Sequence, residues 1–171
     1  MGRALVVYES MFGNSELIAR AVAEGVAEVL PVDLVDVTHA PRDLEGYAVL
    51  VAGGPTHAFT MSRDTTRREA REQGATHGCV GEGLREWLAA LPQQGRHPWF
   101  ASFDTRVTRR RHLPASAARS AARSARRHGL REVASPESFF VEDVDGPLVA
   151  GELERARHWG LDVASAVPAA A

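Results

Sequence analysis

Short apolar runs alternate along the chain with longer stretches in which apolar residues recur every three or four positions. The runs at 4–7, 47–54 and 98–103 contain few polar residues. Such runs are typical of strands that are buried on both faces of a parallel sheet. An alternating segment at 32–37 predicts another strand, and we expect a fifth at about 131–142.

The intervals between these runs predict helices. The first helix follows the first strand and ends near Pro31, and the charged segment 63–73 predicts a short exposed helix. Further helices are expected at 83–92, at 114–129 and from about residue 148 onward. The apolar stripe of the first helix comprises Leu17, Ile18, Ala21, Val22, Gly25, Val26 and Val29. The stripe of the third helix comprises Leu84, Trp87, Leu88 and Leu91. The stripe of the last helix comprises Leu153, Ala156, Arg157 and 159–161.

The order of these elements predicts an α/β fold. We expect each of the five strands to be followed by a helix, with right-handed crossovers between parallel strands. The result is a three-layer, doubly wound sandwich, which binds ligands at the carboxyl ends of its strands. A length of 171 residues suits one core. We therefore expect one domain at 1–167 and a disordered tail at 168–171.

Composition and charge narrow the class of protein. Apolar residues make up 44% of the chain, and the net charge is -2. No apolar run approaches the ~18 residues that cross a bilayer, and the single cysteine, Cys79, cannot form an internal disulfide. The sequence predicts a cytoplasmic protein that has no membrane contact and is held together by packing.

The turn between the first strand and the first helix has the chemistry of an anion site. Ser10, Asn14 and Ser15 supply polar side chains, Gly13 permits a tight backbone, and the helix start adds unpaired N–H groups. No arginine lies between residues 4 and 19, so we expect neutral hydrogen bonds to hold any phosphate there. The alternative is an ordinary strand-to-helix turn with Asn14 as its N-cap.

The same stretch, "YESMFGNSELIA", resembles the phosphate-binding loop of the short-chain flavodoxins. In that family an aromatic-ended strand leads into Ser, two spacers, Gly, then Asn or Thr and Ser or Thr. The segments "GGPTHAF" and "FASFDTR" fall where flavodoxin-like proteins place their other two flavin loops. The resemblance implies bound flavin mononucleotide (FMN) and a five-stranded sheet with strand order 2-1-3-4-5.

The family's site residues carry over onto matching positions of this chain. The phosphate would be held by Ser10, Met11, Phe12, Gly13, Asn14 and Ser15. The edge of the isoalloxazine ring would meet Pro55, Thr56, His57, Ala58 and Phe59. The third loop would contribute Phe103, Asp104, Thr105 and Arg106.

The sequence departs from the family at several of these positions. His57 stands where many flavodoxins have a tryptophan or tyrosine, and no tyrosine follows Asp104. We therefore expect thinner aromatic cover of the ring, supplied by Phe59, His57 or Met11. Ala58 replaces a frequent glycine, and an alanine should resist a backbone turn that needs a positive φ.

A cationic segment follows the third loop. Residues 106–131 include nine arginines and no acidic residue, whereas electron-carrying flavodoxins are usually strongly acidic. Arg106 and Arg109–Arg111 would attract an anionic substrate, a nicotinamide cofactor phosphate or an acidic partner; the alternative is a solvated surface. Nucleic acid is not expected, because no aromatic residues are interleaved with the arginines.

Other combinations predict no catalytic or metal-binding residue. Glu9 is expected to be an exposed residue at a strand end, and His77 and Cys79 are expected to be loop residues. The sequence thus predicts an FMN-binding redox protein that either carries electrons to a partner protein or reduces a small acceptor such as a quinone. A cofactor-free binding or regulatory module of the same fold remains the alternative. The oligomeric state is left open, a homodimer included.

Overall fold

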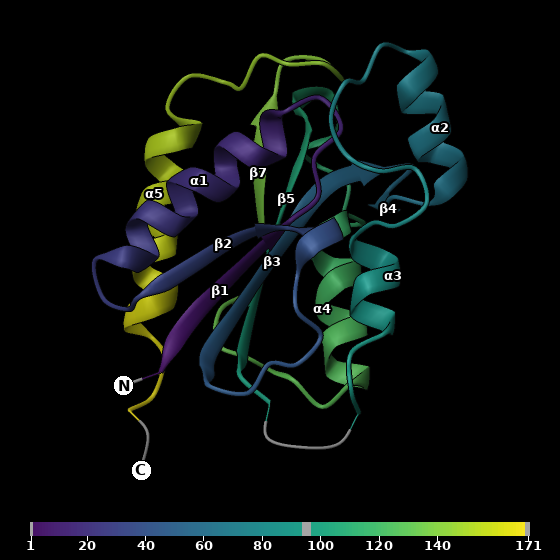
Figure 1. Cartoon of the computed structure of the whole chain (residues 1–171). Coiled ribbons are helices and arrows are strands. Elements are labelled where there is room, and N and C mark those ends of the chain that lie inside the picture. Colours follow the sequence, from purple (N-terminus) through teal and green to yellow (C-terminus); the bar gives the residue numbers. More distant parts are fainter. Residues whose placement is uncertain (1, 94–96, 170–171) are drawn as a thin grey trace.

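A computed structural model describes residues 2–93 and 97–169, and its centre is a parallel sheet (Figure 1). Its strands are β1 (Arg3–Tyr8), β2 (Val32–Asp36), β3 (Tyr47–His57), β4 (Thr60–Met61), β5 (Trp99–Val107), β6 (Arg131–Glu132) and β7 (Glu137–Val141). The helices are α1 (Asn14–Ala27), α2 (Asp64–Glu72), α3 (Leu84–Ala89), α4 (Ala117–Arg127) and α5 (Glu152–Ser165). Two 3-10 turns complete the elements, η1 (Val37–His39) and η2 (Thr108–Arg110).

The strand order confirms the predicted doubly wound sheet. The order is β2-β1-β3-β5-β6, so β5 is the predicted fourth strand. The predicted fifth strand is divided into β6 and β7, both of which pair with β5 in parallel. One expectation is wrong: β2 is followed only by η1 and a loop, not by a long helix.

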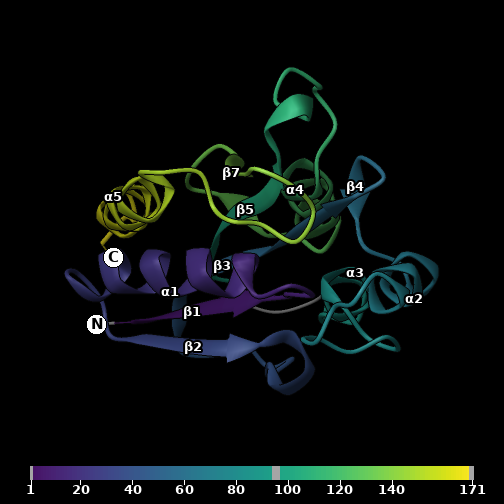
Figure 2. The ribbon, with the colours of Figure 1, turned by 90° about the horizontal axis from the view of Figure 1, so that it is seen from above.

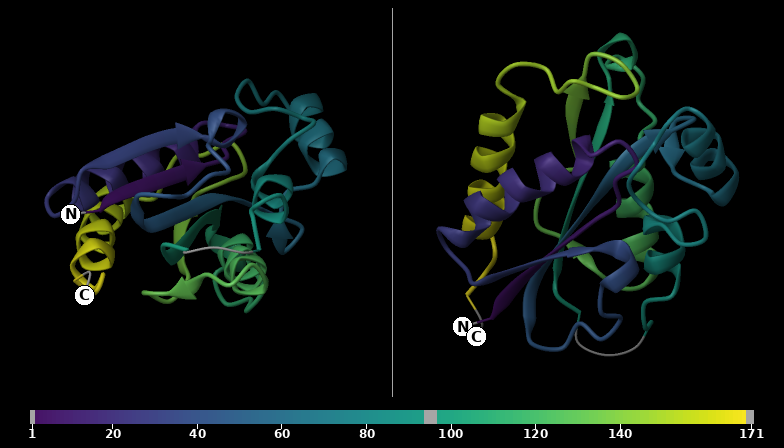
Figure 3. Two further views of the ribbon diagram at one scale, coloured as in Figure 1. Left: turned by 60° about the horizontal axis from the view of Figure 1, so that its bottom comes forward. Right: turned by 45° about the horizontal axis from the view of Figure 1, so that its top comes forward.

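The helices lie in two layers. In Figure 2, α1 and α5 lie on one side of the sheet and α3 and α4 on the other. Phe103 and Phe139 belong to the core under α1 and α5, while Trp87 and Phe100 belong to the core under α3 and α4. Figure 3 shows α2 at the outer edge of the molecule, beyond α3.

Glycines bring α1 and α5 into backbone contact. A β-carbon on Gly25 would lie 1.9 Å from the carbonyl oxygen of Arg157, and one on Gly160 would lie 2.2 Å from that of Val22. Neither side chain could be accommodated without moving a helix. The two helices therefore fit together only because these positions have no side chain.

Several predicted helix faces need correction. Leu17 and Val29 of the first apolar stripe, and Leu153 of the last, are exposed. The last helix begins at Glu152, after Gly151 with φ 87°, because residues 148–151 form the loop before it. The small residues of α1 and α5 meet each other instead, so the larger apolar side chains at the margins of the stripes face solvent.

The predicted second flavin loop, residues 55–59, is part of a β-hairpin. Strand β3 continues to His57 and forms a hairpin with β4, in which His57 pairs with Thr60.

The predicted C-terminal tail is only partly described: Pro168 and Ala169 have no regular structure, and 170–171 lie outside the described residues. In the described part of the chain, no helix is both long and apolar enough to cross a membrane.

Candidate functional site

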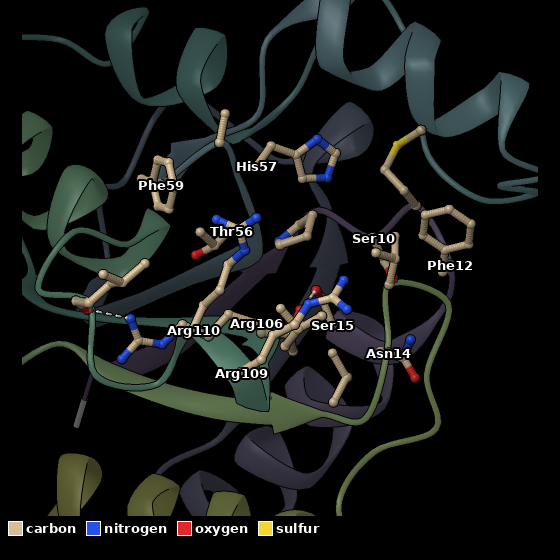
Figure 4. A pocket seen from close by; sticks show the side chains of 18 of the residues that line it. Ser10, Phe12, Asn14, Ser15, Thr56, His57, Phe59, Arg106, Arg109 and Arg110 are labelled. Atoms are coloured by element: carbon tan, nitrogen blue, oxygen red, sulfur yellow. Dashed lines mark hydrogen bonds between the residues drawn. The ribbon is translucent and has the colours of Figure 1, made fainter.

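A cavity of about 400 Å³ opens at the carboxyl ends of β1, β3 and β5 (Figure 4). Its walls come mainly from three predicted loops, and Val141 and Val144 add to them from the end of β7 and the loop after it. The first contributes Ser10, Met11, Phe12, Asn14 and Ser15. The second contributes Pro55, Thr56, His57, Ala58 and Phe59. The third contributes Thr105 and Arg106, followed by Val107, Arg109, Arg110, Leu113 and Ala115.

The first loop presents the open start of α1 to this cavity. Gly13 is the N-cap residue, with φ 91°, and no side chain caps the helix, so Asn14 is not the cap. The Gly13 amide donates to Ser10 Oγ at 3.0 Å, which closes the turn. Uncapped N–H groups and the helix dipole both favour an anion here.

The segment after α2 covers the outside of this turn. Met11 is buried against Ala70 and Ala75, although it also lines the cavity. The His77 amide donates to the Met11 carbonyl at 3.1 Å, and the His77 ring lies beside Gly13. The turn is thus fixed from outside before any ligand binds.

Glu9 is not the exposed residue that the sequence predicted. It is buried and accepts hydrogen bonds from Ser62 Oγ and from the Leu84 amide, the latter at 2.7 Å. Buried Arg67 donates to Ser62 Oγ at 2.7 Å and pairs with Glu86 at 3.2 Å. Burial raises the pKa of Glu9, while its hydrogen bonds and Arg67 oppose that rise. This network ties the end of β1 to the segment 62–84.

The second loop is a strained hairpin. Ala58 has φ 45° and Phe59 has φ 70°. A type I′ turn requires positive φ at both central residues, which are usually Asn or Gly. The alanine therefore adopts the positive φ that we expected it to resist.

Neighbouring side chains hold this hairpin in place. Thr56 Oγ1 accepts from the Ala117 amide at 2.9 Å, and Thr60 Oγ1 donates to Ser120 Oγ at 2.9 Å. Arg85 donates to the Met61 carbonyl at 2.7 Å. These contacts come from α3 and α4, so the surrounding fold sets the turn.

His57 is the titratable group on the second loop. Burial lowers the pKa of His57, the charge of Arg67 lowers it further, and a hydrogen bond with the Thr66 backbone opposes both. A neutral imidazole therefore faces the cavity at neutral pH. Within 2–93 and 97–169, no three His, Cys, Asp or Glu residues gather closely enough to hold a metal ion.

Two predicted third-loop residues lie away from the cavity. The Phe103 ring packs beneath Gly53, where a β-carbon would approach to 2.3 Å. Asp104 is fully buried and accepts from the Ala118 amide at 2.9 Å, at the start of α4. Burial raises the pKa of Asp104, and hydrogen bonds from Ser116, Ala118 and Ser138 oppose that rise. Along β5 the alternation of the strand turns Phe103 into the core.

Thr105 and Arg106 do line the cavity. Thr105 Oγ1 and Ser15 Oγ lie 2.6 Å apart, which joins the third loop to the first. Arg106 donates to the carbonyls of Leu113 and Arg111 at 2.8 and 3.1 Å, while its buried Nε has no partner in the described structure. The two hydrogen bonds to backbone carbonyls fix the Arg106 side chain along the third loop.

Apolar residues from three loops surround the mouth of the cavity. Phe59, Leu113 and Val144 all line it and are 43%, 40% and 48% exposed. The guanidinium of Arg110 lies 5.0 Å from the centre of the Phe59 ring. Leu113, Val141 and Val144 were not predicted as cavity residues, because nothing in their local sequence pattern connects these separate segments to the predicted flavin loops.

These features define a class: a doubly wound α/β protein whose cavity lies at the uncapped start of α1, where the strand order reverses between β1 and β3. The flavodoxin family model matches residues 6–86, which include the first two cavity loops. The protein is therefore flavodoxin-like, in sequence over that segment and in fold over nearly the whole chain.

Solved structures extend the likeness. A flavodoxin from the domain Archaea is 20% identical, with a TM-score of 0.65 over 96% of this chain and 98% of that chain. Flavodoxin 2 from Bacillus cereus is 17% identical, with a TM-score of 0.68 over 96% and 99%. Rubredoxin oxygen:oxidoreductase from Desulfovibrio gigas is 14% identical, with a TM-score of 0.67, and the match covers 98% of this chain but only 36% of that one. At these identities the likeness establishes the fold.

Proposed function

We propose that the protein binds FMN non-covalently in the 400 Å³ cavity and acts as a redox protein. The observation that carries this proposal is that the uncapped start of α1 faces the same cavity as the second and third loops. The match to the flavodoxin family model over 6–86 and the flavodoxin fold support it. FMN, when bound, supplies one- or two-electron chemistry that protein side chains lack.

The residues present suit the parts of this cofactor. Ser10, Asn14 and Ser15, with the amides of α1, would hold the phosphate. The hairpin from Pro55 to Phe59 would border the ring, and Thr105 and Arg106 line the same cavity from the third loop. Neutral His57 would pack on the ring without adding charge. The chain therefore binds, orients and shields the reactive group.

Two redox roles fit this arrangement. The first is electron transfer to a partner protein, which the exposed apolar residues around the mouth support. The second is reduction of a small acceptor of the quinone type by a donor that reaches the same opening. The proposal includes one domain over 1–167, supported by the common sheet, and a cytoplasmic location.

The test begins with the visible absorbance of the purified protein and titration of the apoprotein with FMN. We expect a flavin spectrum, or saturable quenching of flavin fluorescence. Asn14→Ala and Ser15→Ala should each weaken FMN binding by about 10- to 100-fold, because hydrogen bonds to a charged acceptor are lost. Ser165→Ala, at the distant end of α5, is the matched control. A colourless protein that does not bind added FMN would favour the alternative, a cofactor-free binding or regulatory module.

A further inference from the structure

Arg109 is the cation that the first loop lacks. The cavity brings it together with Ser10, Asn14 and Ser15, although the two segments are far apart in the sequence. Figure 4 shows Arg109 extending toward Ser15 and Asn14, whereas Arg110 extends toward Phe59. The expectation that only neutral groups surround the phosphate position therefore holds for the first loop and not for the whole cavity.

The β7–α5 loop independently places Arg109 near the start of α1. Arg109 Nη2 lies 3.5 Å from Asp143 Oδ1. The Gly146 amide donates to the Asp143 carbonyl at 3.0 Å, so both residues belong to one turn. Gly146 in turn lies against the amide group of Asn14, where a β-carbon would be 2.8 Å from Oδ1. Arg109, Asp143 and Asn14 are thus linked through one short turn.

The other arginines of this loop already have partners. Arg106 is bound to two backbone carbonyls, and Arg110 lies over the Phe59 ring. Arg111 donates to His112 at 3.1 Å. Among residues 2–93 and 97–169, the polar contact of the Arg109 side chain is its long ion pair with Asp143. The side chains of Arg109 and Asp143 are 65% and 63% exposed. Exposed pairs of this kind contribute little, so the Arg109 guanidinium is easily released.

We infer that Arg109 exchanges Asp143 for the phosphate of the bound ligand and thereby selects phosphorylated over unphosphorylated flavin. A guanidinium can donate two parallel hydrogen bonds to a phosphate, and the amides of α1 would hold the remaining oxygens. Asp143 then acts as a competitor, because its carboxylate holds Arg109 when no phosphate is present. This inference rests on the proposed function, since it concerns the same cavity.

The decisive experiment compares FMN and riboflavin binding to Arg109→Gln, Asp143→Asn and the unsubstituted protein. Arg109→Gln should weaken FMN binding about 10- to 100-fold and leave riboflavin binding unchanged. Asp143→Asn should tighten FMN binding several-fold. Arg111→Gln removes the same charge from the same loop and is the matched control. Circular dichroism of each variant checks that the fold is kept.

The outcomes separate this inference from the proposed function. If both flavins bind and Arg109→Gln weakens them equally or not at all, the role of Arg109 is wrong while FMN binding stands. If neither flavin binds, titration with inorganic phosphate decides: binding that Arg109→Gln abolishes supports the phosphate site without FMN. No binding of phosphate or flavin would overturn both.

Discussion

Two turns border the cavity, and both contain residues with positive φ, but the residue types at these positions differ. Between β1 and α1, the positive φ falls on Gly13, which takes it without strain. Between β3 and β4, it falls on Ala58 and Phe59, where a left-handed backbone costs about 1–3 kcal/mol each. The difference shows two ways to fix the backbone conformation of a turn. In the first turn a glycine adopts the positive φ without strain, and in the second turn contacts from the surrounding fold hold strained residues in place.

Both turns share one support. Glu9 precedes the first turn and Ser62 follows the hairpin, and the two are hydrogen-bonded to each other. Arg67 reaches Ser62 and the carbonyl of Val80, the latter at 2.8 Å. Damage to this network should therefore affect both turns.

The largest effect is expected from Arg67→Met. The substitution removes the fully buried cation that contacts Ser62 and Glu86, and breaking a buried ionic network costs about 3–5 kcal/mol. Urea unfolding should show a loss of this size in the free energy of unfolding. Arg68→Met, on the exposed face of the same helix, should cost less than about 0.5 kcal/mol. A loss below 1 kcal/mol for Arg67→Met would contradict the shared support.

The pH dependence of stability should come next, through Glu9→Gln. Because burial raises the pKa of Glu9 in the folded state, the folded protein keeps this proton to a higher pH than the unfolded chain. The stability that protonated Glu9 contributes is complete below the unfolded pKa and is lost as pH rises through the folded pKa. Glutamine cannot ionise, so the variant should gain stability relative to the parent as pH rises above the unfolded-chain glutamate pKa of about 4.3. A difference in the free energy of unfolding between the two proteins that stays constant from pH 4 to pH 8 would contradict this.

Gly13→Ala tests the first turn directly. Alanine at φ 91° should cost about 1–2 kcal/mol, because its β-carbon meets the backbone. The added carbon would lie 3.4 Å from the His77 ring, an ordinary contact, so the cost measures backbone strain. Gly81→Ala, in open space, should leave thermal stability nearly unchanged.

Ala58→Gly should give the smallest change, of opposite sign. Glycine relieves strain in the hairpin but increases the freedom of the unfolded chain, so we expect a gain of up to about 1 kcal/mol. The midpoint of thermal unfolding is the measurement. A destabilisation as large as that of Gly13→Ala would mean that the hairpin is not strained.

The sequence predicted what depends on local pattern. Periodicity placed the main strands and helices, and the residues around Gly13 indicated the tight turn between β1 and α1. Local pattern failed at the turn between β3 and β4, because alanine and phenylalanine do not predict a type I′ turn. There the surrounding fold overrides local preference. Local sequence pattern also could not pair Glu9 with Ser62, or place Arg109 and Asn14 in one cavity, since both depend on how the loops meet in space.

The glycine contact between α1 and α5 should couple the opening motions of the two helices. With Gly25 and Gly160 in backbone contact across the interface, neither helix can tilt alone. Their amides should therefore exchange with solvent deuterons as one cooperative unit, with similar opening free energies along both helices. Any ligand that stabilises the start of α1 should then slow exchange in α5, far from the cavity it fills.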